Sequence, residues 1–185
     1  ENNLADFEQL FQALSKAQQL PQHIVYLWPV THGDSQYSLE EKNDRLNDRL
    51  KNYDTNMQSC FWGLFNLSKV LCEYETPICL TVVSTDMQSI VTPSIPEKSL
   101  LIGPISVLPH EMPHIETQSI DISLLHISAD GLKKVAKQII HEIGSANDER
   151  MVAYRGNDRW IRTIKDAPIK EMNHLKPEWL RPGGT

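Results

Sequence analysis

Apolar and polar stretches alternate along the chain in a pattern that predicts helices and strands in turn. Near the start, apolar residues recur at helical spacing and indicate an amphipathic helix that ends before Pro21: Leu4, Phe7, Leu10, Phe11 and Leu14. The continuous apolar run 24–28 then predicts a short buried strand. The polar, charge-dense stretch 31–54 predicts a partly helical surface excursion, and its acidic cluster at 40–48 predicts a solvated face.

A second helix and a second strand follow. Apolar residues at helical intervals predict a helix over 57–71, with Thr55 and Gln58 as a capping box at its start. After Pro77, the apolar run 78–83 predicts another buried strand.

The next unit repeats this order. Ser94 and Glu97 predict a capping box for a helix over 100–108, which Gly103-Pro104 is expected to kink or interrupt. The alternating stretch 117–122 predicts a third strand.

The last pattern along the chain predicts a helix followed by a pair of strands. Ser128 is the expected start of the helix and Gly144 its end. Strands are predicted at 151–155 and 160–164, around a turn at 156–158. The whole order, α-β-α-β-α-β-α-β-β, predicts an α/β fold with a mostly parallel sheet, helices on both faces and a C-terminal strand pair.

Composition and net charge limit the number of domains and the kinds of partner that we expect for this chain. The 185 residues fit a single domain, 1–185, and 40% of them are hydrophobic. The net charge of -6 argues against free nucleic acid or an anionic membrane as partners. The chain has three cysteines and no CxxC pair, which favours reduced thiols in the cytoplasm. With no signal peptide pattern and no initial Met, we expect the chain to begin inside a longer protein.

Two tests for nucleotide-dependent reductase chemistry are negative. The glycines form neither GxGxxG nor GxxxxGK[ST], so no cofactor-binding residue is assigned. No tyrosine is followed four residues later by lysine, so the Tyr-x-x-x-Lys pair of short-chain reductases, in which lysine lowers the pKa of the tyrosine, is absent. No catalytic residue is assigned either.

One motif points to a metal site. Residues 110–114 read His-Glu-Met-Pro-His and match the H-E-x-x-H signature of zinc proteases. That chemistry requires His110 and His114 on one continuous helix with Glu111 as general base. Pro109 and Pro113 oppose such a helix, so we predict a loop after a helix and no metal ligand here.

The remaining candidate residues are expected to have structural roles. Cysteines and tryptophans at the ends of apolar runs are expected in the core rather than as metal ligands or a ligand-stacking wall: Cys72, Cys79, Trp28 and Trp160. Histidines near apolar runs are expected to pack or hydrogen-bond there: His23, His126 and His141.

Four segments, in order, resemble a known family. They are HIVYLW at 23–28, LLIGPISVLPHEMPHIETQSIDI at 100–122, VAYRGNDRWIRTI at 152–164 and RPGGT at 181–185. They are similar to the structural, non-catalytic subdomain of ketoreductases in modular polyketide synthases. The likeness runs from about Phe7 to Thr185, with Tyr26 where the family usually has histidine.

The resemblance implies a truncated Rossmann-like unit without a cofactor loop. NADPH and the Ser-Tyr-Lys catalytic set would then belong to a catalytic subdomain beginning after Thr185. The complete enzyme would reduce a β-ketoacyl chain held on an acyl carrier protein, and the carrier and other synthase domains would be its partners. In this reading residues 110–114 are a structural turn.

Two alternatives remain open at this level. The chain is equally compatible with a pseudo-ketoreductase or docking element of an assembly line without reductase activity. A zinc hydrolase using His110, Glu111 and His114 ranks last, because of Pro113.

Overall fold

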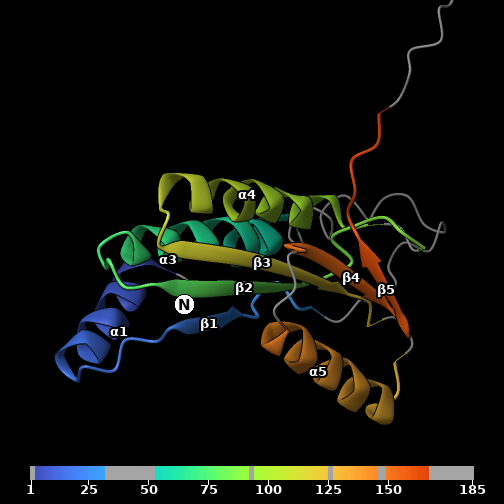
Figure 1. The fold of residues 1–185 in the computed structure, drawn as a ribbon, viewed down its shortest axis with the longest axis horizontal. Coiled ribbons are helices and arrows are strands. Elements are labelled where there is room, and N and C mark those ends of the chain that lie inside the picture. Colours follow the sequence, from blue (N-terminus) through green and yellow to red (C-terminus); the bar gives the residue numbers. More distant parts are fainter. Residues whose placement is uncertain (1–2, 32–52, 92–93, 125–126, 146–148, 167–185) are drawn as a thin grey trace, which may run out of the picture.

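The computed structural model describes residues 3–31, 53–91, 94–124, 127–145 and 149–166. A five-stranded sheet in the order β1-β2-β3-β4-β5 forms the centre of the molecule (Figure 1). Strands β1 to β4 pair in parallel and β5 pairs antiparallel to β4. The predicted fold class and element order are therefore confirmed. The elements are α1 (Leu4–Lys16), β1 (His23–Tyr26), the π-helix η1 (Met57–Trp62), α3 (Gly63–Leu71), β2 (Ile78–Thr85), the 3₁₀-helix η2 (Pro96–Leu101), α4 (Ile102–Glu111), β3 (Ile115–Ile122), α5 (Ala129–Gly144), β4 (Met151–Arg155) and β5 (Asp158–Ile161).

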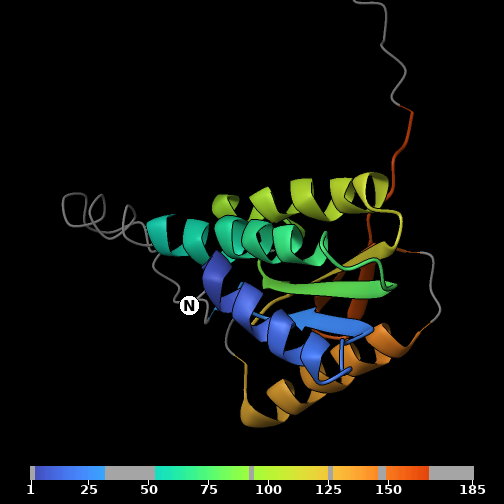
Figure 2. The same cartoon turned by 90° about the vertical axis from the view of Figure 1, so that its left-hand side faces the viewer.

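Each face of the sheet carries its own apolar core, because alternate side chains of a strand point to opposite faces. The larger core joins α1, α3 and α4 to one face of β2 and includes Phe11, Leu64, Leu71, Leu80 and Ile105. The smaller core lies on the other face, where α5 covers β3 and β4, and includes Val83, Ile120, Ile122 and Val152. Figure 2 shows α1 beside β1, at the end of the molecule that faces the viewer.

The handedness of the crossovers changes within the sheet. The chain steps from β1 to β4 in one direction across the sheet. The helices α3 and α4 lie on one face, whereas α5 lies on the other (Figure 1). The β3–α5–β4 connection therefore has the opposite hand to the two connections before it. Such a change is unusual, since about 98% of parallel crossovers are right-handed.

The first strand is shorter and more exposed than predicted. It ends at Tyr26, and only Tyr26 of its four residues is buried. Leu27 and Trp28 lie beyond the strand and are 51% and 57% exposed. The prediction of a buried strand over 24–28 was wrong because β1 is an edge strand, and which strand takes the edge depends on the whole sheet.

Neither predicted capping box forms. Residues 53–56 are already helical, so Thr55 does not begin a helix. The 3₁₀-helix η2 has Ile95 at its N-cap without a side-chain hydrogen bond, and Pro96 opens its first turn. The expected interruption near Gly103 is present one residue earlier, where η2 gives way to α4 at Ile102.

The π-helix η1 is held by a tyrosine from the neighbouring strand. The Tyr26 hydroxyl donates a hydrogen bond of 2.5 Å to the carbonyl of Ser59. Burial raises the pKa of Tyr26 well above its ordinary value, so the hydroxyl remains a donor at physiological pH. The residue that departs from the resembled family pattern thus makes a specific contact to the helix.

Helix α4 continues through a proline that we expected to lie beyond its end. Pro109 lacks an amide and so leaves the carbonyl of Ile105 without its usual helical donor. The Thr117 hydroxyl of β3 donates to that carbonyl at 2.6 Å. This bond explains why the helix reaches Glu111, whereas the sequence predicted a loop over 110–114.

Helix α5 and the strand pair follow their predictions closely. The Ser128 side chain accepts a hydrogen bond from the Gly131 amide and caps α5, which ends at Gly144. Strand β5 begins two residues earlier and ends three residues earlier than the predicted strand over 160–164, so the turn contains only Gly156 and Asn157. Gly156 has a φ of +63°, which glycine adopts without strain.

Candidate functional site

Polar side chains gather where β2, β3 and β4 end. Open α/β sheets bind their ligands outside the carboxyl ends of the strands, so this edge is where a site is expected. Buried polar and charged residues from four segments lie there: Ser84, Thr85, Lys98, Asp121 and Arg155. We call this set the carboxyl-edge cluster.

A buried ion pair joins β3 to β4 in this cluster. Arg155 Nη2 lies 2.7 Å from Asp121 Oδ2, and the two side chains are 6% and 0% exposed. The same guanidinium donates to the carbonyls of Gln88 and Tyr154 at 2.7 and 3.0 Å. An ion pair this deeply buried is tolerated only when further hydrogen bonds compensate for the loss of water.

The Asp121 carboxylate is almost surrounded by donors. Besides Arg155, it accepts bonds from the Met87 amide at 2.8 Å, the Gln88 amide at 3.0 Å and the Ser84 hydroxyl at 3.0 Å. The two amides converge on it because Asp86 has a φ of +51° and turns the chain back after β2. The carboxylate is thereby occupied by contacts within the chain.

The second half of the cluster is a buried lysine. Lys98, from η2, is 0% exposed. Its ammonium donates to the hydroxyls of Thr31, at 2.8 Å, and Thr85. Burial lowers the pKa of Lys98, and weaker attractions to Cys60, Asp86 and Asp121 oppose that shift.

This lowered pKa makes stability depend on pH. Between the folded-state pKa of Lys98 and its usual value near 10.5, the unfolded chain binds the extra proton, so the free energy of unfolding gains a contribution that rises with pH. Lys98→Met removes that contribution. We expect the difference in unfolding free energy between wild type and Lys98→Met, measured by urea denaturation from pH 7 to 10, to shift in favour of wild type as the pH rises.

The exposed Lys137→Met serves as the control for losing a lysine. Taking differences also cancels the opposing contribution of Tyr26, whose pKa burial raises. Loss of Lys98 removes an attraction that lowers the pKa of Cys60, and this adds to the expected shift in the same direction. The same pH profile in both variants would show that the buried Lys98 does not titrate differently in the folded protein.

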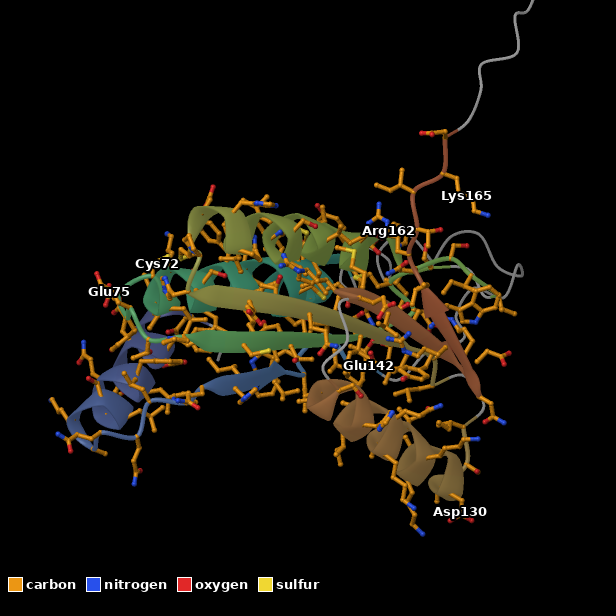
Figure 3. The ribbon with its side chains drawn as sticks, viewed as in Figure 1. Cys72, Glu75, Asp130, Glu142, Arg162 and Lys165 are labelled. Carbon is orange, nitrogen blue, oxygen red and sulfur yellow. The ribbon has the colours of Figure 1, made fainter. Side chains whose placement is uncertain are left out.

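A separate charged contact fastens α5 to the strand pair. Glu142 is 1% exposed and accepts two bonds from the Arg159 guanidinium, at 2.7 and 2.9 Å. The Tyr154 hydroxyl donates to the same carboxylate at 2.5 Å. Figure 3 shows Glu142 on the side of α5 toward the sheet and Asp130 at the other end of the helix. Of the α5 side chains, only Glu142 is fully buried.

The zinc-protease signature is split between two elements. His110 and Glu111 lie in the last turn of α4, and His114 follows after Pro113, immediately before β3. The two histidines therefore do not share one continuous helix. The His114 carbonyl accepts the Ile78 amide at 2.9 Å, as part of the sheet. Over the described ranges, no group of three or more His, Cys, Asp or Glu side chains is arranged to hold a metal ion.

The other candidate residues are more exposed than predicted. Trp28 and Trp160 are 57% and 44% exposed and follow or occupy opposite edge strands, so they form neither core nor a shared wall. Histidines 23 and 141 are exposed as well, and 126 lies outside the described residues.

The cysteines are free, as the sequence predicted. Cys72 is exposed rather than in the core, and its sulfur lies 2.8 Å from that of Met112; Cys79 is half-buried. In the part of the chain that the structure describes, no helix is both long enough and apolar enough to cross a membrane.

The sequence reasoning missed the carboxyl-edge cluster, although part of the signal was present. Asp121 and Arg155 both lie in segments that carry the family resemblance, SIDI and VAYRGNDRW. A charged residue inside an otherwise apolar strand indicates a buried partner, since unpaired buried charges are rare. The partner itself lies 34 residues away, which no local pattern specifies.

Solved structures share this fold. One is described as "Adenylation, ketoreductase, and pseudo Asub multidomain structure of a keto acid-selecting NRPS module"; it is 25% identical over 86% of this chain, with a TM-score of 0.69. An N-terminal ketoreductase from the macrolactin assembly line is 10% identical over 89%, with a TM-score of 0.59. An alcohol dehydrogenase from Thermococcus sibiricus is 10% identical over 84%, with a TM-score of 0.58, and 72% of its chain is covered.

The similarity to assembly-line ketoreductase regions covers a small part of those proteins. The chain matches 12% of the multidomain module and 31% of the macrolactin ketoreductase. No protein-family model and no curated protein matches the sequence. The fold is thus Rossmann-like and resembles that of reductases, and the resemblance extends to ketoreductase regions of assembly-line synthases.

Proposed function

We propose that this chain is the structural half of an assembly-line ketoreductase and takes no direct part in the chemistry. A catalytic subdomain of the parent synthase would bind NADPH and reduce the β-ketoacyl chain carried by an acyl carrier protein. The role of this chain would be to pack against that subdomain and maintain its shape. The proposal covers residues 1–185 as one structural unit.

The observation that carries the proposal is the filled carboxyl edge of the sheet. Asp121 is enclosed by Arg155 and two amides, and Lys98 is bound to Thr31 and Thr85. A dinucleotide needs backbone amides free to approach its phosphates, and no glycine-rich turn follows β1, β2 or β3 among the described residues. These residues do not fit a bound NADPH.

The position of Lys98 supports the same reading. Counting back four residues from Lys98 gives Ser94, where the Tyr-x-x-x-Lys pair would require tyrosine. The Lys98 ammonium donates to the hydroxyls of two threonines, and no hydrogen bond joins it to a tyrosine in the part of the chain that the structure describes. Without a tyrosine at this spacing, the proton donor of a carbonyl reduction has to come from elsewhere in the synthase.

Two exposed apolar regions offer surfaces for packing. On the helix face, an aromatic group of Phe61, Trp62 and Phe65 has ring centroids 5.2 to 6.0 Å apart, and Trp62 is 43% exposed. At the sheet edge, Trp160 and Ile161 of β5 are 44% and 45% exposed. Exposed apolar groups of this kind mark contact surfaces.

The test compares this chain with the parent protein. We expect NADPH, followed by fluorescence titration, to bind the parent protein and not the 185-residue chain. We further expect the parent protein to reduce a β-ketoacyl thioester, and Trp62→Asp in the parent to lower that activity by weakening the packing. Leu132→Asp, on the exposed side of α5, is the matched control.

Each outcome of these measurements distinguishes between the possible functions of the chain. NADPH binding by the 185-residue chain alone would contradict the absence of a cofactor site. A parent protein that neither binds NADPH nor reduces the thioester would favour a pseudo-ketoreductase or docking element. Equal loss of activity from Trp62→Asp and Leu132→Asp would argue against the aromatic group as the packing surface.

A further inference from the structure

Strand β5 leaves one edge of the sheet unpaired. It pairs with β4 on one side, and no other strand among the described residues pairs with it. All four of its residues are exposed, and it contains no proline, a residue that often protects an open edge. An open strand edge presents unpaired amides and carbonyls, to which a strand from another chain can be added.

The opposite edge of the sheet is more covered. Strand β1 lies there, and α1 runs beside it (Figure 2). Tyr26 of β1 is buried, and its hydroxyl is bonded to η1. Figure 1 shows β5 at the far end of the sheet from β1. The edge of β5 is therefore the better position for a further strand.

The backbone groups of β5 determine how such a strand pairs. The Arg162 amide donates to the Met151 carbonyl at 3.4 Å and so points toward β4. In an antiparallel pair, residues bonded to the partner strand alternate with residues whose backbone groups point away from it. The outward groups of β5 and its extension are therefore those of Arg159, Ile161 and Thr163.

This arrangement makes β5 complementary to itself. In two copies related by a twofold axis at Ile161, the outward groups of residue 159 meet those of residue 163. Trp160 then lies opposite Arg162 of the second copy, on the same face of the sheet, where the indole attracts the guanidinium. Arg159 is already paired with Glu142 of its own chain.

Other registers are less favourable. An axis at Arg159 would set this arginine directly opposite its own copy, and like charges in that position repel. An axis at Thr163 would lie beyond the end of β5, which is Ile161. The register centred on Ile161 is the one that uses the strand without opposing like charges.

We propose that β5 joins two copies of this chain edge to edge, as an antiparallel strand pair around a twofold axis at Ile161. The outward backbone groups supply the hydrogen bonds, and the contact between Trp160 and Arg162 fixes the register. This inference goes beyond the proposed function, whose test lies at the aromatic group of the helix face and does not involve the edge of β5.

Sedimentation equilibrium of the purified chain measures the association. We expect a monomer–dimer equilibrium. Ile161→Pro should raise the dissociation constant about thirtyfold, because each dimer loses the two central amide donors. The β4–β5 pair should survive, since the Ile161 amide points away from β4. Ile164→Pro is the matched control: Ile164 is 97% exposed, follows the strand and makes no backbone bond to the second copy in this register, so its dissociation constant should equal that of the wild type.

A cross-link tests the position of the axis. With the exposed Cys72 replaced by serine, Ile161→Cys places two thiols opposite each other, at a Cα separation of about 5.5 Å that a disulfide accepts. Air oxidation should link this variant into covalent dimers. Thr163→Cys is the control and should stay unlinked, because its two copies lie about 13 Å apart along the strands.

Three results would each overturn the proposal. The first is a wild-type chain that remains monomeric at submillimolar concentration, which would leave the edge of β5 to another part of the parent protein. The second is an equal dissociation constant for Ile161→Pro and Ile164→Pro. The third is equal cross-linking of Ile161→Cys and Thr163→Cys. None of these measurements involves NADPH or reductase activity, so they are decided separately from the proposed function.

Discussion

Replacing Asp121 with alanine is expected to lower the free energy of unfolding by about 3–5 kcal/mol. The substitution leaves the Arg155 guanidinium buried without its counter-charge, and it removes the acceptor of the Met87 and Gln88 amides. A buried charge without a partner is among the few single changes that destabilise a domain this much. Urea denaturation of both proteins at pH 7 measures the loss.

An exposed aspartate provides the control. Asp130 pairs with Lys133 at 3.1 Å, but its side chain is 91% exposed, so Asp130→Ala should change stability by less than about 1 kcal/mol. The double variant Asp121→Leu with Arg155→Met removes both charges and should be less destabilised than Asp121→Ala alone. If the double variant loses as much stability as Asp121→Leu and Arg155→Met lose when each is measured singly and the two losses are added, the two residues act independently.

Glu142→Leu should destabilise the protein by about 2–3 kcal/mol, because three hydrogen bonds to a buried carboxylate are lost together. The expected loss of stability is smaller than for Asp121→Ala because the Arg159 side chain is 31% exposed. Water can therefore replace part of the hydrogen bonding that Arg159 loses with Glu142. Since Glu142 is the main buried attachment of α5, the amides of this helix should exchange with deuterium before those of β2 and β3. Hydrogen exchange followed by NMR measures this order.

A second carboxylate near the same arginine is the matched control. Glu149 lies 3.6 Å from Arg159 and is 42% exposed, so Glu149→Leu should leave both stability and the exchange of α5 nearly unchanged. Uniform acceleration of exchange across the sheet in Glu142→Leu would show that α5 does not open as a separate unit.

The sequence predicted the secondary structure better than it predicted burial. The helix over Ala129–Gly144 was placed correctly from its Ser128 cap and its apolar spacing, both of which are local features. Trp28 and Trp160 were assigned to the core because large aromatic residues are usually buried. Both lie at the edges of the sheet, and no property of the residues themselves determines which strands become the edges.

The predicted end of α4 was wrong for a related reason. Proline normally ends a helix because it leaves one carbonyl without a donor. Here the Thr117 hydroxyl supplies the missing donor to Ile105 from a neighbouring strand. The sequence does not show that β3 runs beside α4, so it contains no signal that the helix can accommodate Pro109.

By itself the sequence determined the α/β class, the order of the elements and the strand pair at the end. These follow from apolar periodicity, helix caps and turn residues, whose effects are confined to a few neighbouring positions. The tertiary structure alone decided that α5 covers the opposite face, that Asp121 meets Arg155 and that Lys98 is buried between two threonines. Those contacts join residues 13 to 67 positions apart, so they exist only once the sheet has brought the strand ends together.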